Sequence, residues 1–234
     1  MDFGKSFTFM FDDKDWVGKI LIGALFALLS IALVGIPFLV GYTLEVVRRA
    51  AAGREDALPA WDDLGDKFVQ GLVLLVIFFV FMLPATLLSG CLGASLSTIS
   101  ENIRSDAGAT MFGLGAALVG LLASAYAFVV GLFYPAITMR YAMTRDFGAT
   151  FNLAELWRVA TANLGSYIIV LLVTWVAGLI AGFGVIACVI GVFVTYFWGM
   201  LVSAHITGQY WHENLTSEVV APSEPDLPSE TTTF

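Results

Sequence analysis

The sequence predicts an all-α integral membrane protein with about six transmembrane or re-entrant helices in three hairpins. Hydrophobic residues make up 59% of the 234 residues and charged residues only 13%, whereas about a quarter of a soluble domain is charged. Apolar runs of about 18 or more residues recur along the chain, long enough to cross a hydrocarbon core of about 30 Å. These runs do not alternate between apolar and polar residues, which argues against a transmembrane barrel.

Four apolar stretches carry the expected helices. The first, 17–47, is interrupted at 34–37, and the second and third are continuous. The last, 166–205, would be roughly 60 Å long as one helix at about 1.5 Å per residue, so it must fold back. The expected spans are 17–34, 36–52, 69–88, 111–139, 166–183 and 185–208, within a helical membrane domain over residues 17–212.

The first stretch can be interpreted as one span or as a hairpin broken at Gly35-Ile36-Pro37. The hairpin gives six crossings and leaves only Arg104 of the 11 Lys and Arg residues on the far side of the membrane. A single span gives five crossings and spreads the basic residues over both sides. Because short basic loops face the cytoplasm, the charges favour the hairpin, with both termini cytoplasmic. The second arm is short enough to be a re-entrant helix.

Two flanking segments differ from the apolar stretches. In residues 1–16, aromatic side chains occur among polar ones, which predicts an amphipathic segment at the cytoplasmic interface. The alternative is a loosely ordered tail. Residues 213–234 are acidic and contain no Lys or Arg, and a segment of this composition buries too little apolar surface to fold. We therefore expect a disordered C-terminal tail.

The later apolar stretches contain no Asp, Glu, Lys, Arg or His in their interiors. Ionisable residues within the membrane mark ion and proton pathways, so this pattern argues against a proton-coupled carrier. It leaves the passage of a neutral or lipid-like molecule open. The sequence also lacks a Walker loop, an HExxH motif and a GxSxG motif. We expect no catalytic residues, no metal site and no enzymatic activity.

Two histidines and two cysteines are the remaining reactive residues. His205 and His212 lie on one face of the same helix end, so they cannot bind one iron from opposite sides. His205 alone is a weak candidate for a single-histidine pigment ligand; contact with a headgroup, water or backbone is the simpler interpretation. Cys91 and Cys188 either form a disulfide at the outer face or are two small apolar residues. No cofactor is predicted, and bound lipid is expected.

Polar and aromatic residues gather near the cytoplasmic ends of the first helices. Glu45 lies within one turn of Arg48 and Arg49, a spacing that predicts an ion pair. The three aspartates in 62–66 could approach a divalent ion, but such sites need more oxygen ligands, and a capped surface helix is the alternative. We predict a structural ordering cluster at the cytoplasmic side, with no catalytic role, made of Trp16, Tyr42, Glu45, Arg48, Arg49, Trp61 and Asp62.

Several short motifs resemble an uncharacterised prokaryotic membrane family, called domain of unknown function 4013. The resemblance covers about residues 3–212 and is most specific in the first seventy. Ala60 and Leu64 stand where the family pattern has an acidic and an aromatic residue. The family has no established activity, so it implies a prokaryotic multi-pass membrane protein and supplies no functional residues. The motifs are Asp15-Trp16-x-x-Lys19-Ile20-Leu21-Ile22-Gly23, Ile36-Pro37, Gly41-Tyr42-x-x-Glu45-x-x-Arg48-Arg49, Gly53, Leu58-Pro-x-Trp61-Asp62-Asp63-x-Gly65, Phe68-x-x-Gly71, Phe151-Asn152, Asn163 with Tyr167, and His205 with Gly208-Gln209.

These observations favour a non-enzymatic protein of a prokaryotic cytoplasmic (inner) membrane. Small residues four positions apart, such as Gly178/Gly182 and Gly199/Ser203, permit close helix approach within the chain or between chains. We therefore expect a scaffold or accessory subunit of a larger membrane complex, or a homo-oligomer. Its partners would be membrane lipids and other membrane subunits or itself, with no nucleic acid. The alternative is a small transporter or lipid-handling protein, which a polar cavity at the membrane midplane would favour. A lipid-modifying enzyme is the least favoured class.

Overall fold

The computed structural model describes residues 3–54, 58–100, 106–184 and 188–216. Within these ranges the chain forms helices and no strand, which confirms the all-α class. The elements are α1 (Phe3–Thr8), η1 (Phe9–Asp12), α2 (Trp16–Leu29), η2 (Ser30–Ala32), α3 (Gly35–Ala51), α4 (Leu64–Ser100), α5 (Asp106–Leu132), α6 (Tyr134–Thr144), η3 (Gly148–Phe151), α7 (Leu153–Thr161), α8 (Leu164–Phe183) and α9 (Cys188–Asn214).

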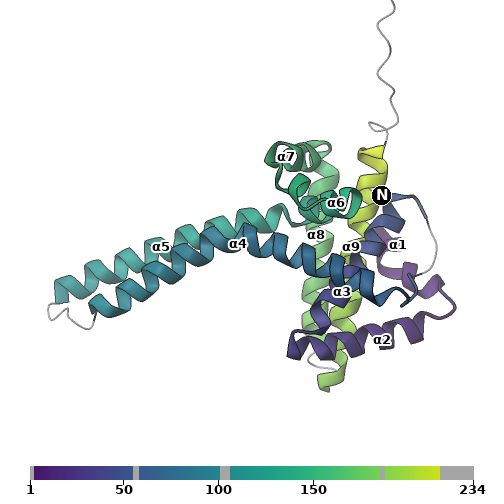
Figure 1. Ribbon diagram of the computed structural model, residues 1–234, viewed down its shortest axis with the longest axis horizontal. Helices are drawn as coiled ribbons and strands as arrows, with labels where there is room; N and C mark the ends of the chain where they lie inside the picture. The colour runs from purple at the N-terminus through teal and green to yellow at the C-terminus, as the bar shows by residue number, and fades with distance from the viewer. Residues whose placement is uncertain (1–2, 55–57, 101–105, 185–187, 217–234) are drawn as a thin grey trace, which may run out of the picture.

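The molecule consists of a helical body and a long hairpin that projects from it (Figure 1). In the body, α8 and α9 lie side by side and α3 packs along α9. Helix α2 crosses near the end where α8 and α9 are joined, and α6 and α7 lie near the opposite end. The hairpin consists of α4 and α5, and it runs at a steep angle to α8 and α9 (Figure 1). The beginning of α4 packs against α3, so this helix belongs to both parts.

A sharp break separates α2 from α3. Leu33 adopts a left-handed backbone conformation, with φ of 63°. A Cβ atom at Gly35 would overlap with the carbonyl oxygen of Phe26, so only glycine fits where α3 begins. Pro37 follows in the first turn of α3, where the missing N–H is tolerated. The chain thus turns at the position where the sequence predicts a break.

The third apolar stretch differs from its prediction. The sequence predicts one span over 111–139, but α5 ends at Leu132 and a separate helix, α6, begins at Tyr134. Pro135 lies in the first turn of α6, and a proline there has no N–H to continue the preceding helix. Helix α4 in turn extends well beyond the predicted 69–88 and contains Pro84.

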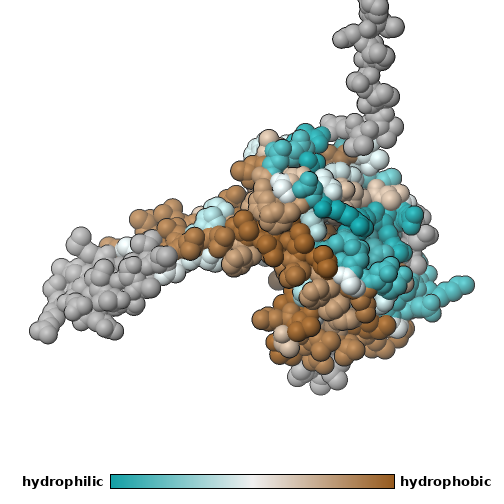
Figure 2. All heavy atoms as spheres, viewed as in Figure 1, coloured by the Kyte–Doolittle hydropathy of each residue, from teal (hydrophilic) through white to brown (hydrophobic). Residues whose placement is uncertain are grey.

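Three helices of the described part are long and apolar enough to cross a membrane: Leu64–Gly90, Gly113–Leu132 and Leu164–Phe183. The N-terminal segments Gly4–Asp12 and Trp16–Ala32 are separated by a 106° bend, and they would give a fourth span only if they are counted together as one broken helix. Helices α2 and α3 have 14 and 17 residues, fewer than the roughly 20 that a span needs. The count of six crossings therefore stays a prediction. Figure 2 shows apolar side chains on the part of the hairpin near the body and on the lower body, and polar ones at the upper right of the body.

The N-terminal segment is packed against the body. Phe9 and Met10 are buried, and Ser6 hydrogen-bonds with His205 of α9 across 3.1 Å. These contacts favour an ordered N-terminal segment over the alternative of a loosely ordered tail. Residues 217–234, which include most of the predicted tail, and the side chains of Cys91 and Cys188 lie outside the described part, so the disordered tail and the disulfide stay predictions.

The predicted small-residue pairs serve different purposes. A Cβ atom at Gly199 would lie 3.1 Å from the carbonyl oxygen of Ala177, so this glycine lets α9 approach α8 closely. In contrast, Gly178 and Gly182 of α8 and Gly120 of α5 have no described atom within 4 Å of an added Cβ. Only the first of these positions is explained by packing within the described chain.

Candidate functional site

An aromatic stack lies where three parts of the chain meet. The ring of Trp61 stacks on that of Tyr42, with 4.2 Å between the ring centroids. The Tyr42 hydroxyl donates to the carbonyl oxygen of Pro59 at 2.8 Å, and Trp61 Nε1 donates to the carbonyl oxygen of Lys19 at 2.9 Å. These contacts attach the segment before α4 to both α2 and α3.

Two further rings complete this aromatic cluster, which consists of Phe26, Tyr42, Trp61 and Phe197. Phe26 of α2 stacks on Trp61 with 4.9 Å between ring centroids, and the ring centroid of Phe197 in α9 lies 5.5 Å from that of Tyr42. Tyr42 and Phe197 are fully buried. Since aromatic pairs contribute about 0.5–1.5 kcal/mol each beyond the area that they bury, the aromatic cluster fixes α2, α3 and α9 relative to one another.

A charged network lies beside the aromatic cluster. Glu45 pairs with Arg49 at 2.8 Å and with Lys67 of α4 at 2.9 Å. Lys67 is buried, and its ammonium also donates to the carboxylate of Asp62 at 3.1 Å. The hydrogen bond from Lys67 lowers the pKa of Asp62 below its usual value. This charged network of Glu45, Arg49, Asp62 and Lys67 joins α3 to the start of α4.

Arg48 extends these connections to α6. Its Nε donates to the carbonyl oxygen of Ala142 at 3.0 Å, and its guanidinium also donates to the side chain of Gln70. Gln70 in turn donates to Asp66. The predicted ion pair within α3 is formed by Glu45 with Arg49, whereas Arg48 holds together α3, α4 and α6.

A second anchor holds the N-terminal segment. Lys19 Nζ pairs with Asp13 at 2.5 Å and donates to the carbonyl oxygen of Leu58 at 2.6 Å. Burial raises the pKa of Asp13, but the hydrogen bond and charge of Lys19, together with the N–H of Asp15, outweigh it and lower the pKa. Lys19, Lys67 and Gln70 were not among the predicted site residues. All three stand inside or beside the family motifs, which was the available signal.

Six of the seven predicted cluster residues meet in this region. The exception is Trp16, whose ring packs edge-on against Phe11 with 5.0 Å between centroids. The cluster links helices through side chains that are all engaged with protein groups. This arrangement suits a structural role.

His205 is enclosed by the N-terminal segment. Phe9 stacks on its ring with 4.1 Å between centroids, and Nδ1 hydrogen-bonds with Ser6. His212 lies further along α9, where Nδ1 hydrogen-bonds with the carbonyl oxygen of Ala51 at 3.1 Å. A single-histidine pigment ligand at His205 stays a prediction. In the described ranges, no three His, Cys, Asp or Glu residues are grouped to hold a metal ion.

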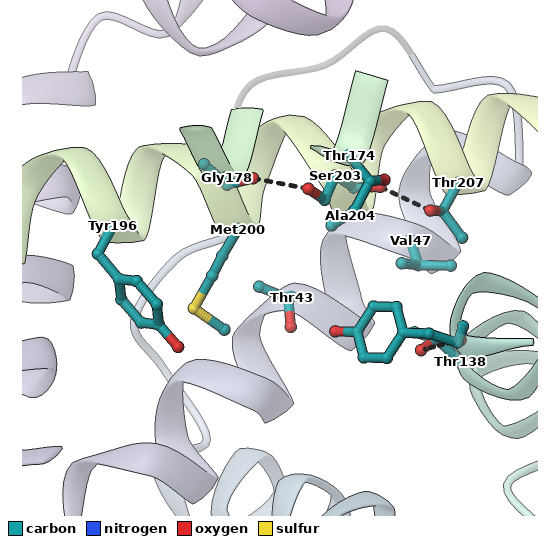
Figure 3. A pocket seen from close by; sticks show the side chains of 12 residues that line it. Thr43, Val47, Thr138, Thr174, Gly178, Tyr196, Met200, Ser203, Ala204 and Thr207 are labelled. Atoms are coloured by element: carbon teal, nitrogen blue, oxygen red, sulfur yellow. Dashed lines mark hydrogen bonds between the residues drawn. The ribbon is translucent and has the colours of Figure 1, made fainter. Parts of the chain in front are cut away.

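A cavity of about 210 Å³ lies between α3, α6, α8 and α9 (Figure 3). No Asp, Glu, Lys, Arg or His occurs among the described residues that line it, whereas hydroxyl groups are frequent. Figure 3 shows side chains from these helices around one central space. The hydroxyl-bearing side chains are Thr43, Tyr134, Thr138, Thr174, Tyr196, Ser203 and Thr207.

Most of these Thr and Ser hydroxyls already donate their protons. Those of Thr43, Thr138, Ser203 and Thr207 donate to a carbonyl oxygen three or four residues earlier in their own helix, at 2.8, 2.9, 2.9 and 2.6 Å. Their oxygen lone pairs remain able to accept. Thr174 differs, because its Oγ1 is buried and has no hydrogen-bond partner in the described part of the chain. Such a group calls for an explanation, since leaving it unpaired costs about 1–3 kcal/mol.

None of these cavity residues was predicted as a site residue, although the sequence contains a signal. Several lie four positions apart on one helix, as do Tyr134 and Thr138, or Ser203 and Thr207. This spacing places both side chains on one helical face. The small-residue pairs that the sequence predicts to allow close helix approach include only three of the lining residues, Gly178, Gly199 and Ser203.

The model of a family described as "Protein of unknown function (DUF4013)" matches residues 24–190. This match confirms the family suggested by the sequence motifs and covers most of the chain. No curated protein and no solved structure matches the chain.

Proposed function

Because the chain belongs to the DUF4013 family, whose function is unknown, we propose a function from its own geometry. The chain is an integral membrane protein that binds an uncharged, lipid-like molecule, as a lipid-handling protein or small transporter. One observation carries this proposal: the hydroxyl-lined cavity at the middle of the longest body helices, whose described lining contains no charged side chain. The small transporter or lipid-handling protein, which was the alternative function in the sequence analysis, is therefore the function that we propose first.

Membrane insertion is supported by the exposed apolar helices. The three helices of sufficient length have most of their side chains outside the protein interior, and such surfaces need lipid or a partner to cover them. Thr174 lies ten residues after Leu164 and nine before Phe183, the ends of α8. At about 1.5 Å per residue, it is roughly 15 Å from either end. If α8 spans a bilayer, the cavity lies near the midplane.

The depth of the cavity favours an uncharged ligand. A charge near the midplane costs several kcal/mol unless it is paired, and none of the described residues that line the cavity has a charged side chain to pair with it. Hydroxyl groups, in contrast, bind an alcohol, ester or amide without charge. The structural cluster described above holds α3, which forms one wall of the cavity through Thr43. Its role in this proposal is to keep that wall in place, with no enzymatic step.

A membrane topology accompanies the proposal. The contact of Ser6 with His205 brings the N-terminal segment to the late part of α9, which supports both termini on one side of the membrane. We assign that side to the cytoplasm and the membrane to a prokaryotic inner membrane, because the basic residues gather there and the motifs are those of a prokaryotic family.

The test is to purify the full chain in mild detergent and identify bound small molecules by mass spectrometry. The wild type should retain an uncharged lipid-like molecule at up to about one per chain. Thr174→Phe, which fills the cavity, should lose it. Val176→Phe, an exposed position of the same helix, should retain it and serves as the matched control. Equal ligand content in all three proteins would reject the proposal.

A second function is favoured by the hairpin of α4 and α5. It projects from the body and exposes apolar residues such as Leu118, Leu121 and Phe128. A scaffold or accessory subunit, or a homo-oligomer, would use such an arm to contact another membrane protein. Stoichiometric recovery of another membrane subunit, or of a stable oligomer, in the same purification would support this function over ligand binding.

A further inference from the structure

A second cavity adjoins the hydroxyl-lined one. It has a volume of about 320 Å³ and lies between α2, α3 and α9. Its lining is mainly apolar, with Leu39, Val40, Val192 and Phe193 among the contributors. The hydroxyl of Ser30, which also lines it, donates to the carbonyl oxygen of Phe26 at 2.9 Å.

The two cavities share two lining residues, Tyr196 and Met200. Along α3, Leu39 borders the apolar cavity and Thr43, one turn later, borders the hydroxyl-lined one. Along α9, Val192 precedes the shared residues and Ser203 follows them. The cavities therefore follow each other along the same two helices. Figure 3 shows Met200 reaching toward Thr43 beside Tyr196.

We propose that the two cavities form one binding site for a single-chain amphiphile with an uncharged, hydroxyl-bearing head, of the monoacylglycerol type. This inference rests on the proposed function and names its ligand class. The head occupies the hydroxyl-lined cavity, and the hydrocarbon chain passes Met200 into the apolar cavity.

The hydrogen-bonding state of the walls selects the head. Four Thr and Ser hydroxyls donate hydrogen bonds to backbone carbonyls of their own helices, so toward the cavity they can only accept. A ligand that donates hydrogen bonds complements them, and a glycerol or other alcohol does so. The buried Oγ1 of Thr174, which has no described partner, supplies a donor for an ester or ether oxygen, and the hydroxyls of Tyr134 and Tyr196 lie in the same lining.

The boundary between the cavities suits the passage of a chain. Met200 is unbranched and has several rotatable bonds, so it adapts to the shape beside it. The apolar cavity continues in one direction from this boundary, between the break at η2 and the start of α9. This cavity is open to the surface beside Ile31, and it is the one apolar extension that we assign to the ligand, so we choose a single-chain amphiphile over a two-chain lipid.

The test measures binding of radiolabelled 1-oleoylglycerol to the full chain in phosphatidylcholine nanodiscs, with two unlabelled competitors. Methyl oleate has the same chain without a hydroxyl, and oleoyl lysophosphatidic acid adds a charge. Both should compete at least ten-fold more weakly than 1-oleoylglycerol itself. Equal competition by methyl oleate would overturn the inference, and this comparison requires no variant to fold.

Variants locate the site. Met200→Trp, at the boundary, should weaken binding of 1-oleoylglycerol at least ten-fold, and Thr174→Val should weaken it several-fold. Leu179→Trp, at an exposed position of α8 outside both cavities, should leave binding unchanged. If Thr174→Phe abolishes binding while Met200→Trp does not alter it, the uncharged site of the proposed function stands and the amphiphile inference fails. If neither variant alters binding, both fail.

Discussion

The indole of Trp61 is held from two directions: its face lies on the ring of Tyr42 at 4.2 Å, and its Nε1 donates to the carbonyl oxygen of Lys19 at 2.9 Å. Tyr42 belongs to α3 and Lys19 to α2, so one side chain from the segment before α4 connects both helices. The arrangement predicts which substitutions loosen the body and which do not.

Trp61→Ala should lower the free energy of unfolding by about 3 kcal/mol, because it removes the stacked ring and leaves a cavity between α2, α3 and α9. Thermal unfolding of the detergent-purified protein, followed by size-exclusion fluorescence, measures this loss. Trp175→Ala is the control, since Trp175 is 68% exposed on α8. Equal melting temperatures for the two variants would contradict a structural role for the aromatic cluster.

Gly41→Ala and Gly71→Ala should each prevent the close approach of α3 and α4. A Cβ atom at Gly41 would overlap with the carbonyl oxygen of Lys67, and one at Gly71 with that of Pro37. Both contacts involve backbone, which cannot move aside as a side chain can. We expect low yields of folded protein. Gly90→Ala, in the same helix but with no described neighbour within 4 Å of an added Cβ, should be neutral or stabilising by up to about 1 kcal/mol.

Lys67→Met should cost about 1–2 kcal/mol of unfolding free energy. Lys67 is buried, and its loss leaves Glu45 with Arg49 alone and Asp62 without its ammonium partner. The estimate is below that for a fully buried pair because both carboxylates retain some contact with water. Arg158→Met removes the exposed partner of Glu155 and should cost less than about 0.5 kcal/mol. Equal melting temperatures for the Lys67→Met and Arg158→Met variants would contradict a stabilising role for the Lys67 ion pairs.

Asp13→Asn should destabilise the attachment of the N-terminal segment in a pH-dependent way. Because the folded protein lowers the pKa of Asp13, its contribution is complete above the unfolded value of about 3.9 and is lost as the pH falls through the lower folded value. The melting temperatures of wild type and variant should therefore differ by a constant amount above about pH 5 and converge toward about pH 3. If the difference in melting temperature grew as the pH fell, the folded protein would raise the pKa of Asp13, which would contradict the prediction.

The composition was sufficient to predict the helical class, and the Gly35-Ile36-Pro37 signal located the break between α2 and α3. Residues close in sequence, such as Glu45 and Arg49, were also paired correctly. Contacts between distant segments could not be predicted, because they depend on how the helices pack. Ser6 meets His205 across 199 positions of sequence, and the cavity gathers hydroxyls from four helices. The end of α5 at Leu132 was not predicted because the run over 111–139 contains no charged residue, although Pro135 within it is a signal for a helix break.

The orientation of the hairpin gives one more prediction. Both arms contain a stretch long and apolar enough to cross a membrane, Leu64–Gly90 and Gly113–Leu132, as does α8. If α8 crosses the bilayer, a hairpin at a steep angle to it does not cross in the same direction (Figure 1). We expect the hairpin to turn toward the direction of α8 in a bilayer. Spin labels at Leu118 and Leu179 should be closer in nanodiscs than in detergent, and an unchanged distance would contradict this.

A hairpin attached to the body only at its base has a further consequence. The tilt of such a hairpin relative to the bilayer normal can change with the thickness of the hydrocarbon core. A helix that is too long for a thin bilayer tilts, and it stands more upright in a thicker one. The base of the hairpin adjoins α6, which forms part of the wall of the hydroxyl-lined cavity. If the hairpin spans the bilayer, a change in bilayer thickness would alter the tilt of the helices next to that wall.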